Sequence, residues 1–229
     1  MAAVPEALVR WKGIARLIPS RFPVAGLFDQ VAAPEDLEAI FELEGWTNDR
    51  ISAEAGLLHN IPPDEWAIGT PLASVVMAAF CHPRVGGARF SGDDRGAWYA
   101  GRTLETALVE SVFHRTREIG EVGGFETRMQ LRVYLADVSA RFHDVRTIRG
   151  GAAFHDPDDY AASQRLGQAL LEAGSNGIVY RSVRHPGGEC VAVLRPAAVK
   201  QCKQAQHLAY VWNGSSIVHV YEKRSFPHL

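Results

Sequence analysis

The chain has 229 residues, of which 47% are hydrophobic and 22% are charged, and its formal net charge is −2 at pH 7. This apolar content is sufficient for a packed core, in one large domain or two small ones. The nearly balanced charge gives no overall attraction to nucleic acid or to an acidic membrane surface, so direct nucleic-acid binding is not expected.

The N-terminal stretch MAAVPEALVRWKGIARLIPS does not resemble a targeting signal. Pro5, Glu6, Arg10 and Lys12 interrupt its apolar residues, which excludes the apolar core of a signal peptide. No run in the chain approaches the roughly 20 apolar residues needed to span a bilayer. We therefore expect a cytoplasmic protein that does not insert into a membrane.

The cysteines and histidines do not follow metal-site spacing. The three cysteines are far apart and form no C-x-x-C pair, which argues against a disulfide framework and a cysteine zinc site. The nine histidines show neither H-x-x-x-H nor H-E-x-x-H spacing. The glycine-rich stretches match neither a P-loop nor a Rossmann fingerprint. No metal is expected.

The first elements predicted along the chain are a strand and a group of helices. Residues 14–18 predict a strand that Pro19 ends, with Arg16 on it and Arg21 just beyond it. Residues 34–43 have the signature of a helix, residues 46–68 read as a loop-rich connection, and an apolar helix is expected from Thr70 to about Phe80. We expect residues 30–80 to be a helical elaboration inside a single domain covering residues 1–229.

The central stretch, residues 86–117, combines a glycine-rich turn, an arginine, an aromatic strand and a helix with an acid. The glycines allow a tight loop that can hold Arg89, and residues 98–100 predict a short apolar strand containing Tyr99. Thr103 is a good N-cap for the following helix, and Glu110 lies at the edge of its buried stripe. A carboxylate there needs a partner, and Arg89 and Tyr99 are the nearby candidates in sequence.

The C-terminal half alternates short strands with one helix. Residues 129–135 alternate apolar and polar side chains as a half-buried strand does. A helix is expected from the acids at 156–159 to residue 173, and Gly174 closes it. Further strands are expected at residues 178–180, 190–194, 209–212 and 217–221, the last two joined by Asn213-Gly214. This order indicates an α/β or α+β fold with a curved or split sheet flanked by helices.

Ser182 follows a predicted buried strand, at a point where strand ends often present functional groups. A serine nucleophile needs a positioned histidine base, and His185 in the same extended loop is not obviously placed for that. The flanking residues also lack the G-x-S-x-G elbow of hydrolases. The residues alone leave Ser182 open between a functional group and a loop serine that satisfies local backbone groups.

Three ordered blocks of sequence resemble the RES-domain family, which is named for an arginine, a glutamate and a serine. They are RLIPSRFP near the start, GGARFS with AWYA and LETALVESVFHR in the middle, and GSNGIVYRSVRHPGGECVAVLRP towards the end. The resemblance spans nearly the whole chain. It implies an ADP-ribosyltransferase-like fold and an enzyme that consumes NAD, with the chain departing from compact members by its longer stretch at residues 30–80.

The resemblance also implies a role for each candidate residue. Glu110 would hold the ribose 2′-hydroxyl and stabilise positive charge that develops on the ribose, and Ser182 would help to place Glu110. Arg16 matches the arginine that grips the phosphates, with Arg21 as its competitor and Arg89 as a further candidate. Tyr99 would stack on nicotinamide or on the ribose.

The resemblance leaves the acceptor of the reaction open among three kinds, and it implies a protein partner. Water as acceptor would make the protein an NAD glycohydrolase, phosphate an NAD phosphorylase, and a protein side chain an ADP-ribosyltransferase. Bacterial members act as toxins that a helix-turn-helix, Xre-like antitoxin neutralises, and both a monomer and a homodimer are open. The alternative from another class is a nucleotide-binding or interaction module without turnover.

Overall fold

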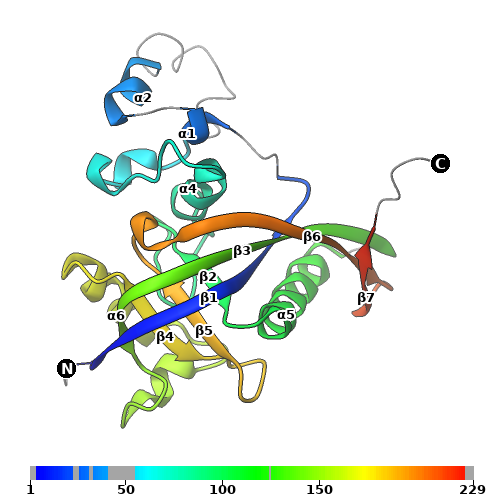
Figure 1. The fold of residues 1–229 in the computed structure, drawn as a ribbon. Helices are drawn as coiled ribbons and strands as arrows, with labels where there is room; N and C mark the ends of the chain where they lie inside the picture. Colours follow the sequence, from blue (N-terminus) through cyan, green and yellow to red (C-terminus); the bar gives the residue numbers. More distant parts are fainter. Residues whose placement is uncertain (1–3, 23–25, 31–32, 41–54, 124, 225–229) are drawn as a thin grey trace.

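The structure is a computed structural model, which describes residues 4–22, 26–30, 33–40, 55–123 and 125–224 (Figure 1). Its strands are β1 (Glu6–Pro19), β2 (Trp98–Gly101), β3 (Thr127–Asp144), β4 (Gly177–Arg181), β5 (Glu189–Val193), β6 (Lys200–Trp212) and β7 (Ile217–Lys223). Its α-helices are α1 (Leu27–Gln30), α2 (Pro34–Ile40), α4 (Ala73–Cys81), α5 (Leu104–Val122) and α6 (Ala161–Glu172). Short 3₁₀ turns are η2 (Leu58–Asn60), η3 (Pro63–Glu65), η4 (Gly151–His155) and η5 (Pro196–Ala198).

The strands form one curved, seven-stranded sheet in the order β1-β2-β5-β4-β3-β6-β7. Strand β1 also pairs with β3, along nearly the whole length of β1. The strands β1, β2, β5, β4 and β3 therefore form a closed ring of pairings, and β6 and β7 extend the sheet beyond β3. The β3–β4 pairing is parallel and the others described are antiparallel. The predicted α+β class and curved sheet are confirmed.

Strands β1 and β3 are much longer than the sequence pattern predicts. The β1–β3 register shifts between Trp11 and Ile14, where Gly13 has a φ of 64° and its N–H donates to the Asp137 carboxylate at 2.8 Å. This bulge interrupts the period-two alternation of β1, and bulges also bend a strand. Because the alternation is broken there, the pattern predicted only the half of β1 that follows the bulge.

Helix α5 begins where the sequence predicts it. The Thr103 hydroxyl accepts a hydrogen bond from the N–H of Thr106 at 3.2 Å, as an N-cap does. At the other end, Gly123 has a φ of 70° and closes the helix. Gly101 lets the helix start close to the end of β2, because a Cβ there would lie 2.5 Å from the Ala107 nitrogen.

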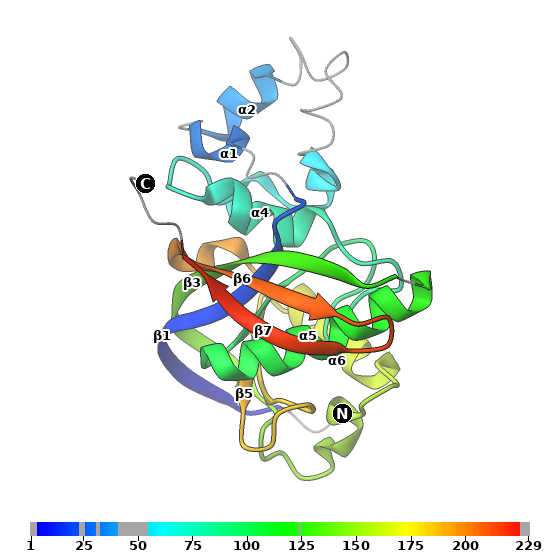
Figure 2. The same cartoon turned by 90° about the vertical axis from the view of Figure 1, so that its right-hand side faces the viewer.

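Helices α4 and α5 lie on opposite sides of the long strands (Figures 1 and 2). Helix α4 contributes to the largest hydrophobic cluster, whereas α5 packs on a second cluster that includes Leu131, Val133, Leu208 and Tyr210. Period-two alternation along β3 supplies both sides, since Tyr134 and Ala136 belong to the α4 side. Leu108 and Val112 of α5 pack on this second cluster, and Glu110 lies between them in the sequence of the helix.

A buried ion triad ties the segment before α4 to the sheet. Glu65 is 9% exposed and accepts hydrogen bonds from Arg95 and Arg195. Arg95, itself 7% exposed, also donates to the Leu194 carbonyl at 3.1 Å. Two cations share one carboxylate here, and removing either one would leave buried polar groups unsatisfied. Residues 31–32 and 41–54 of the predicted 30–80 elaboration lie outside the described residues, and the single-domain assignment stays a prediction.

The hairpin of β4 and β5 separates two environments. Val179, Val191 and Val193 point to the cluster that contains α4, whereas Ile178, Tyr180 and Cys190 point to a cluster with Leu166 of α6. Helix α6 packs tightly against the loop that carries Arg89, since a Cβ at Gly167 would lie 2.0 Å from the Phe90 carbonyl oxygen.

No helix among the described residues is long and apolar enough to cross a membrane.

Candidate functional site

Glu110 and Ser182 meet at the centre of the site, although 72 positions separate them in sequence. The Ser182 hydroxyl donates to Glu110 Oε1 at 2.5 Å. The same hydroxyl oxygen accepts hydrogen bonds from the backbone N–H groups of Arg184, at 3.2 Å, and His185, at 2.9 Å. A serine hydroxyl has one hydrogen and two lone pairs, so these two amides leave the carboxylate as its acceptor. Ser182 therefore orients Glu110.

The second carboxylate oxygen of Glu110 faces the next turn of α5. Its Oε2 lies 3.9 Å from Nε2 of His114, beyond direct hydrogen-bond distance. The Glu110 side chain is 22% exposed. Ser182 thus holds one carboxylate oxygen, and within the described part of the chain the other has no hydrogen bond.

Tyr99 and Glu110 both act on the pKa of Tyr180, and the Tyr99 hydroxyl is bound by the loop after Arg89. Its hydroxyl accepts from the Phe90 N–H at 2.8 Å and shares a hydrogen bond with the Ser91 hydroxyl at 3.1 Å. Burial raises the pKa of Tyr99 to about 12, against the lowering effect of hydrogen bonds from Ser91 and Phe90. The phenol is neutral at physiological pH and holds the loop that follows Arg89.

Arg89 is buried, and backbone carbonyls hold it. Its guanidinium donates to the carbonyls of Phe154 at 3.2 Å and Asp156 at 2.7 Å, and it stacks over the Tyr160 ring at 4.5 Å. The expected pairing of Glu110 with Arg89 or Tyr99 is therefore wrong: Ser182 holds the acid instead. Carbonyls solvate the Arg89 cation without neutralising it, so its charge stays available.

The positive charge of Arg89 acts on several groups around Glu110. It lowers the pKa of Tyr99 and of His114, as a minor contribution beside burial in each case. Burial raises the pKa of Tyr180 well above its usual value, and the charge of Glu110 adds to that rise while Arg89 opposes it. Tyr180 is thus a neutral phenol close to both charges, and the sequence pattern did not single it out.

Arg16 lies on β1 and contacts Trp98 and Tyr99 of β2. It donates to the Tyr99 carbonyl at 3.2 Å and lies over the Trp98 ring at 5.0 Å, while its Nε is buried without a hydrogen-bond partner among the described residues. Burial lowers the pKa of Arg16 to about 10, and the nearby Arg115 cation lowers it further. An anion that reached this guanidinium would relieve both effects.

Arg21 is exposed just past the end of β1. Its guanidinium lies 5.0 Å from the Phe22 ring centre. Burial lowers the pKa of Arg115, and the cations Arg84 and Arg21 lower it further, whereas Glu118 raises it. Arg16 and Arg21 therefore both lie within electrostatic reach of Arg115, and the predicted competition between them is unresolved.

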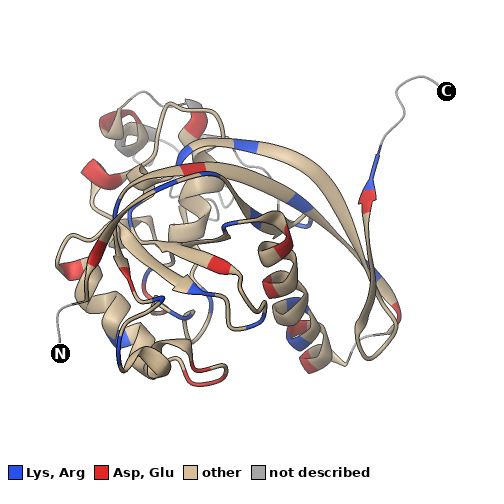
Figure 3. Cartoon of the chain, turned by 60° about the horizontal axis from the view of Figure 1, so that its bottom comes forward, with Lys and Arg blue, Asp and Glu red and all other residues tan. Residues whose placement is uncertain are grey.

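Several residues that the sequence pattern missed complete the site. The Arg184 guanidinium lies 3.5 Å from the centre of the Phe113 ring and donates to the Pro157 carbonyl. Arg84 and Arg115 both pair with Glu118, at 2.9 and 2.5 Å. Helix α5 carries acidic and basic residues along its length (Figure 3). The signal for His114 was its i,i+4 spacing from Glu110, which a search for paired histidines does not detect.

In the part of the chain that the structure describes, no group of three or more histidine, cysteine, aspartate or glutamate side chains is arranged to hold a metal ion. The groups that the structure places at Glu110 are the Ser182 hydroxyl, the His114 ring and the Tyr180 phenol.

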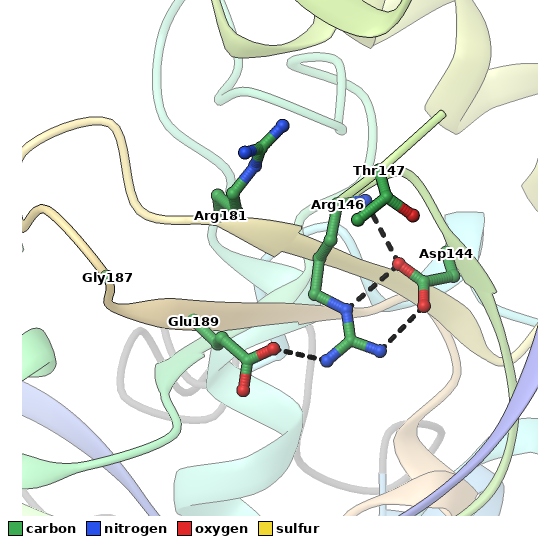
Figure 4. Close-up of a pocket in the computed structure, with 6 residues that line it drawn as sticks. All are labelled: Asp144, Arg146, Thr147, Arg181, Gly187 and Glu189. Atoms are coloured by element: carbon green, nitrogen blue, oxygen red, sulfur yellow. Dashed lines mark hydrogen bonds and ion pairs between the residues drawn. The ribbon is translucent and has the colours of Figure 1, made fainter. Parts of the chain in front are cut away.

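A separate depression of about 410 Å³ opens on the other face of the β4–β5 hairpin (Figure 4). It is lined by Asp144, Arg146, Thr147, Arg181, Gly187 and Glu189. Arg146 bridges the two acids: it donates to Asp144 at 2.6 and 2.9 Å and also to Glu189. Glu189 accepts from Arg102 as well, and both arginines lie over the Trp11 ring. We call Asp144, Arg146, Glu189 and Arg102 the ion clamp.

Comparison with known proteins identifies a family and a relative. A family model described as RES domain matches residues 63–213. This range contains Arg89, Tyr99, Glu110 and Ser182, and it begins after Arg16 and Arg21. An uncharacterized protein of Sinorhizobium fredii, y4oC, is 31% identical over 210 residues, which are 90% of this chain and 85% of that protein.

Among solved structures, the chain is similar to one from the crystal structure of the M. tuberculosis MbcT–MbcA toxin–antitoxin complex. The TM-score is 0.40 and the sequence identity 15%, over 56% of this chain and 73% of the other.

Proposed function

The chain belongs to the RES-domain family, and from that membership together with the site geometry we propose that it cleaves the nicotinamide–ribose bond of NAD. The observation that carries the proposal is the Ser182–Glu110 hydrogen bond, which fixes one carboxylate oxygen, while the other faces His114, a residue on which four arginines act. The leading reactions are hydrolysis and phosphorolysis, and transfer to a protein side chain is the alternative.

Glu110 supplies the electrostatic part of the proposed reaction. Departure of nicotinamide builds positive charge on the ribose, and a fixed carboxylate close to that charge stabilises the transition state more than the ground state. Ser182 contributes by holding Glu110 in place, so that little reorganisation is needed when the charge appears. Tyr99 and Tyr180 present neutral aromatic groups on the same side, with Tyr99 assigned to stacking on nicotinamide or the ribose.

The arginines supply the binding part. NAD carries its negative charge on the pyrophosphate, and a guanidinium recognises phosphate through two parallel hydrogen bonds. Arg16 is the best candidate because its Nε has no partner among the described residues and its cation is disfavoured by burial and by Arg115. Arg89 is fixed by carbonyls and keeps its charge, so it is the second candidate.

We further propose that the protein is the toxin of a bacterial toxin–antitoxin pair. Family membership supports this role, because loss of NAD would harm a host cell. The partner would be a helix-turn-helix, Xre-like antitoxin that covers the arginines and so blocks an anionic ligand. Expression of the chain alone should arrest growth in bacteria, and expression of a Glu110→Gln variant should not. Normal growth with abundant, NAD-cleaving protein would contradict the toxin role.

The direct test is to incubate the purified protein with NAD and measure free nicotinamide. The reaction is run with and without inorganic phosphate, and the ribosyl product is identified by mass. Saturable NAD binding without nicotinamide release would instead indicate a nucleotide-binding module. Labelled NAD that ends on a protein would indicate ADP-ribosyl transfer.

A further inference from the structure

His114 is placed to share a ligand with Glu110. It lies one helical turn after Glu110 on α5, and its Nε2 is 3.9 Å from Glu110 Oε2. That separation is too long for a direct hydrogen bond. One oxygen atom can nevertheless lie within hydrogen-bond distance of both atoms, as a bridging water does. Because Ser182 holds the other carboxylate oxygen, Oε2 is the one that meets such an oxygen.

The imidazole is neutral where most histidines next to an acid gain charge. Burial lowers the pKa of His114 to about 4, and the cations Arg84, Arg115, Arg184 and Arg89 add to the lowering. Glu110 is the acid that faces the ring, while the neighbouring Glu118 is already paired with Arg84 and Arg115.

A neutral His114 has two consequences for chemistry at Glu110. It does not form an ion pair that would cancel the negative charge of the carboxylate. It also keeps a lone pair on Nε2, in the tautomer that carries its proton on Nδ1, which can accept a hydrogen bond. The side chain is 33% exposed, so a small molecule can reach it from solvent.

We propose that His114 binds the acceptor of the reaction, holding its hydroxyl oxygen between Nε2 and Glu110 Oε2. The inference rests on the proposed NAD cleavage and deepens it. The C1′–N bond breaks and its electron pair leaves with nicotinamide, which departs as a neutral molecule. The acceptor oxygen forms a new bond to C1′, and its proton passes to Nε2 and then to solvent. The acceptor class is a protonated oxygen nucleophile, either water or an oxyacid such as inorganic phosphate, which the surrounding arginines would attract.

The decisive experiment compares His114→Gln and His114→Ala with the parent protein and with His207→Gln. His207 lies on β6 and bonds the Gln204 side chain, so it controls for loss of a histidine elsewhere. We expect the His114 variants to lose roughly 10² in kcat, the scale of general base catalysis, with unchanged NAD affinity by calorimetry. Added imidazole should restore part of the rate of His114→Ala and leave His114→Gln unaffected.

Runs with and without phosphate identify the acceptor. If the His114 variants lose rate only in the runs with phosphate, the acceptor that His114 binds is phosphate. If they lose rate equally in the runs with and without phosphate, the acceptor that His114 binds is water. Parent-like kcat in both His114 variants, or a loss that appears only in melting temperature, would overturn the inference. If the parent itself releases no nicotinamide, the proposed function fails instead, and the two failures are thereby distinguished.

Discussion

The two faces of the β4–β5 hairpin carry similar residues in opposite electrostatic states. On the ion clamp face, arginines and acids stabilise one another: the hydrogen bonds that Arg146 donates to Asp144 raise the pKa of Arg146 and lower the pKa of Asp144. On the Glu110 face, burial lowers the pKa of His114, and neighbouring cations lower it further. Mutually satisfied charge indicates structure, whereas an ionisable side chain with a strongly shifted pKa beside a carboxylate indicates a place for a ligand.

The largest expected effect comes from removing the charge of Glu110. Glu110→Gln keeps the size of the side chain and can still accept the hydrogen bond from Ser182. Because the lost interaction acts mainly in the transition state, nicotinamide release should fall by roughly 10² or more, with NAD affinity little changed. Melting temperature is measured on the same preparation and should be close to that of the parent. Near-normal turnover would remove Glu110 from the mechanism.

Arg16→Lys should weaken NAD binding by about tenfold, the equivalent of losing one charge-assisted hydrogen bond. A lysine keeps the positive charge and cannot reproduce the planar fork of the guanidinium. Arg21→Lys is the matched variant and should have a smaller effect, because Arg21 is exposed and lies against the Phe22 ring. Titration of each variant with NAD checks this, and a greater loss at position 21 would transfer the phosphate contact to Arg21.

Breaking the ion clamp should change stability and leave chemistry intact. Arg146→Gln leaves Asp144 without its partner and weakens the hold on Glu189, so the free energy of unfolding should fall by about 1–2 kcal/mol. Arg141→Gln breaks an exposed pair with Glu6 and serves as the control, with no measurable change expected. Urea unfolding gives the stabilities. A loss of NAD turnover in Arg146→Gln, at a temperature where it stays folded, would contradict the division between the two faces.

The smallest effect should appear in how stability depends on pH, and the two faces should respond in different windows. The folded pKa of Asp144 lies below its unfolded value of 3.8, so its contribution is complete above that pH and is lost as pH falls through the folded pKa. His114 has a folded pKa of about 4 against 6.5 unfolded, so the folded protein loses stability as pH falls from 6.5 towards 4.

Two variants separate these windows in thermal unfolding. His114→Gln should gain stability relative to the parent at pH 5 compared with pH 8. Arg146→Gln should instead flatten the dependence at lower pH, where the clamp acids titrate. A His114→Gln difference that is the same at pH 5 and pH 8 would mean that the imidazole is not held neutral in the folded protein.

The sequence predicts local features of this molecule better than its long-range pairing. Thr103 as an N-cap and Gly174, with a φ of 82°, as the end of a helix follow from residue chemistry within one turn, and both are observed. The full length of β1 could not be predicted because a bulge at Gly13 interrupts the alternation on which strand prediction depends. The helix after the acids at 156–159 starts later, at Ala161, because the Asp156 carboxylate accepts hydrogen bonds from the amides of Asp158 and Asp159 in the turn before it.

The site follows the same division. Nearness in sequence suggested Arg89 or Tyr99 as the partner of Glu110, and both proved to be bound by backbone groups of loops instead. The contact of Ser182 with Glu110 followed from family resemblance, because no local pattern connects a strand end with a helix so far away in the chain. His114 could have been predicted from the periodicity of a helix, because it lies four residues after the acid Glu110.

The hydrogen bonding of Ser182 also determines how this serine would react with chemical probes. Both lone pairs of its hydroxyl are occupied by backbone amides, and its proton is committed to Glu110. An activity-based probe such as a fluorophosphonate needs a lone pair that is free to attack phosphorus. A serine bound in this way would stay unlabelled in a proteome treated with such a probe, so a screen for serine hydrolases would pass over the protein. Electrophiles aimed at this serine would accordingly be a poor starting point for inhibitors.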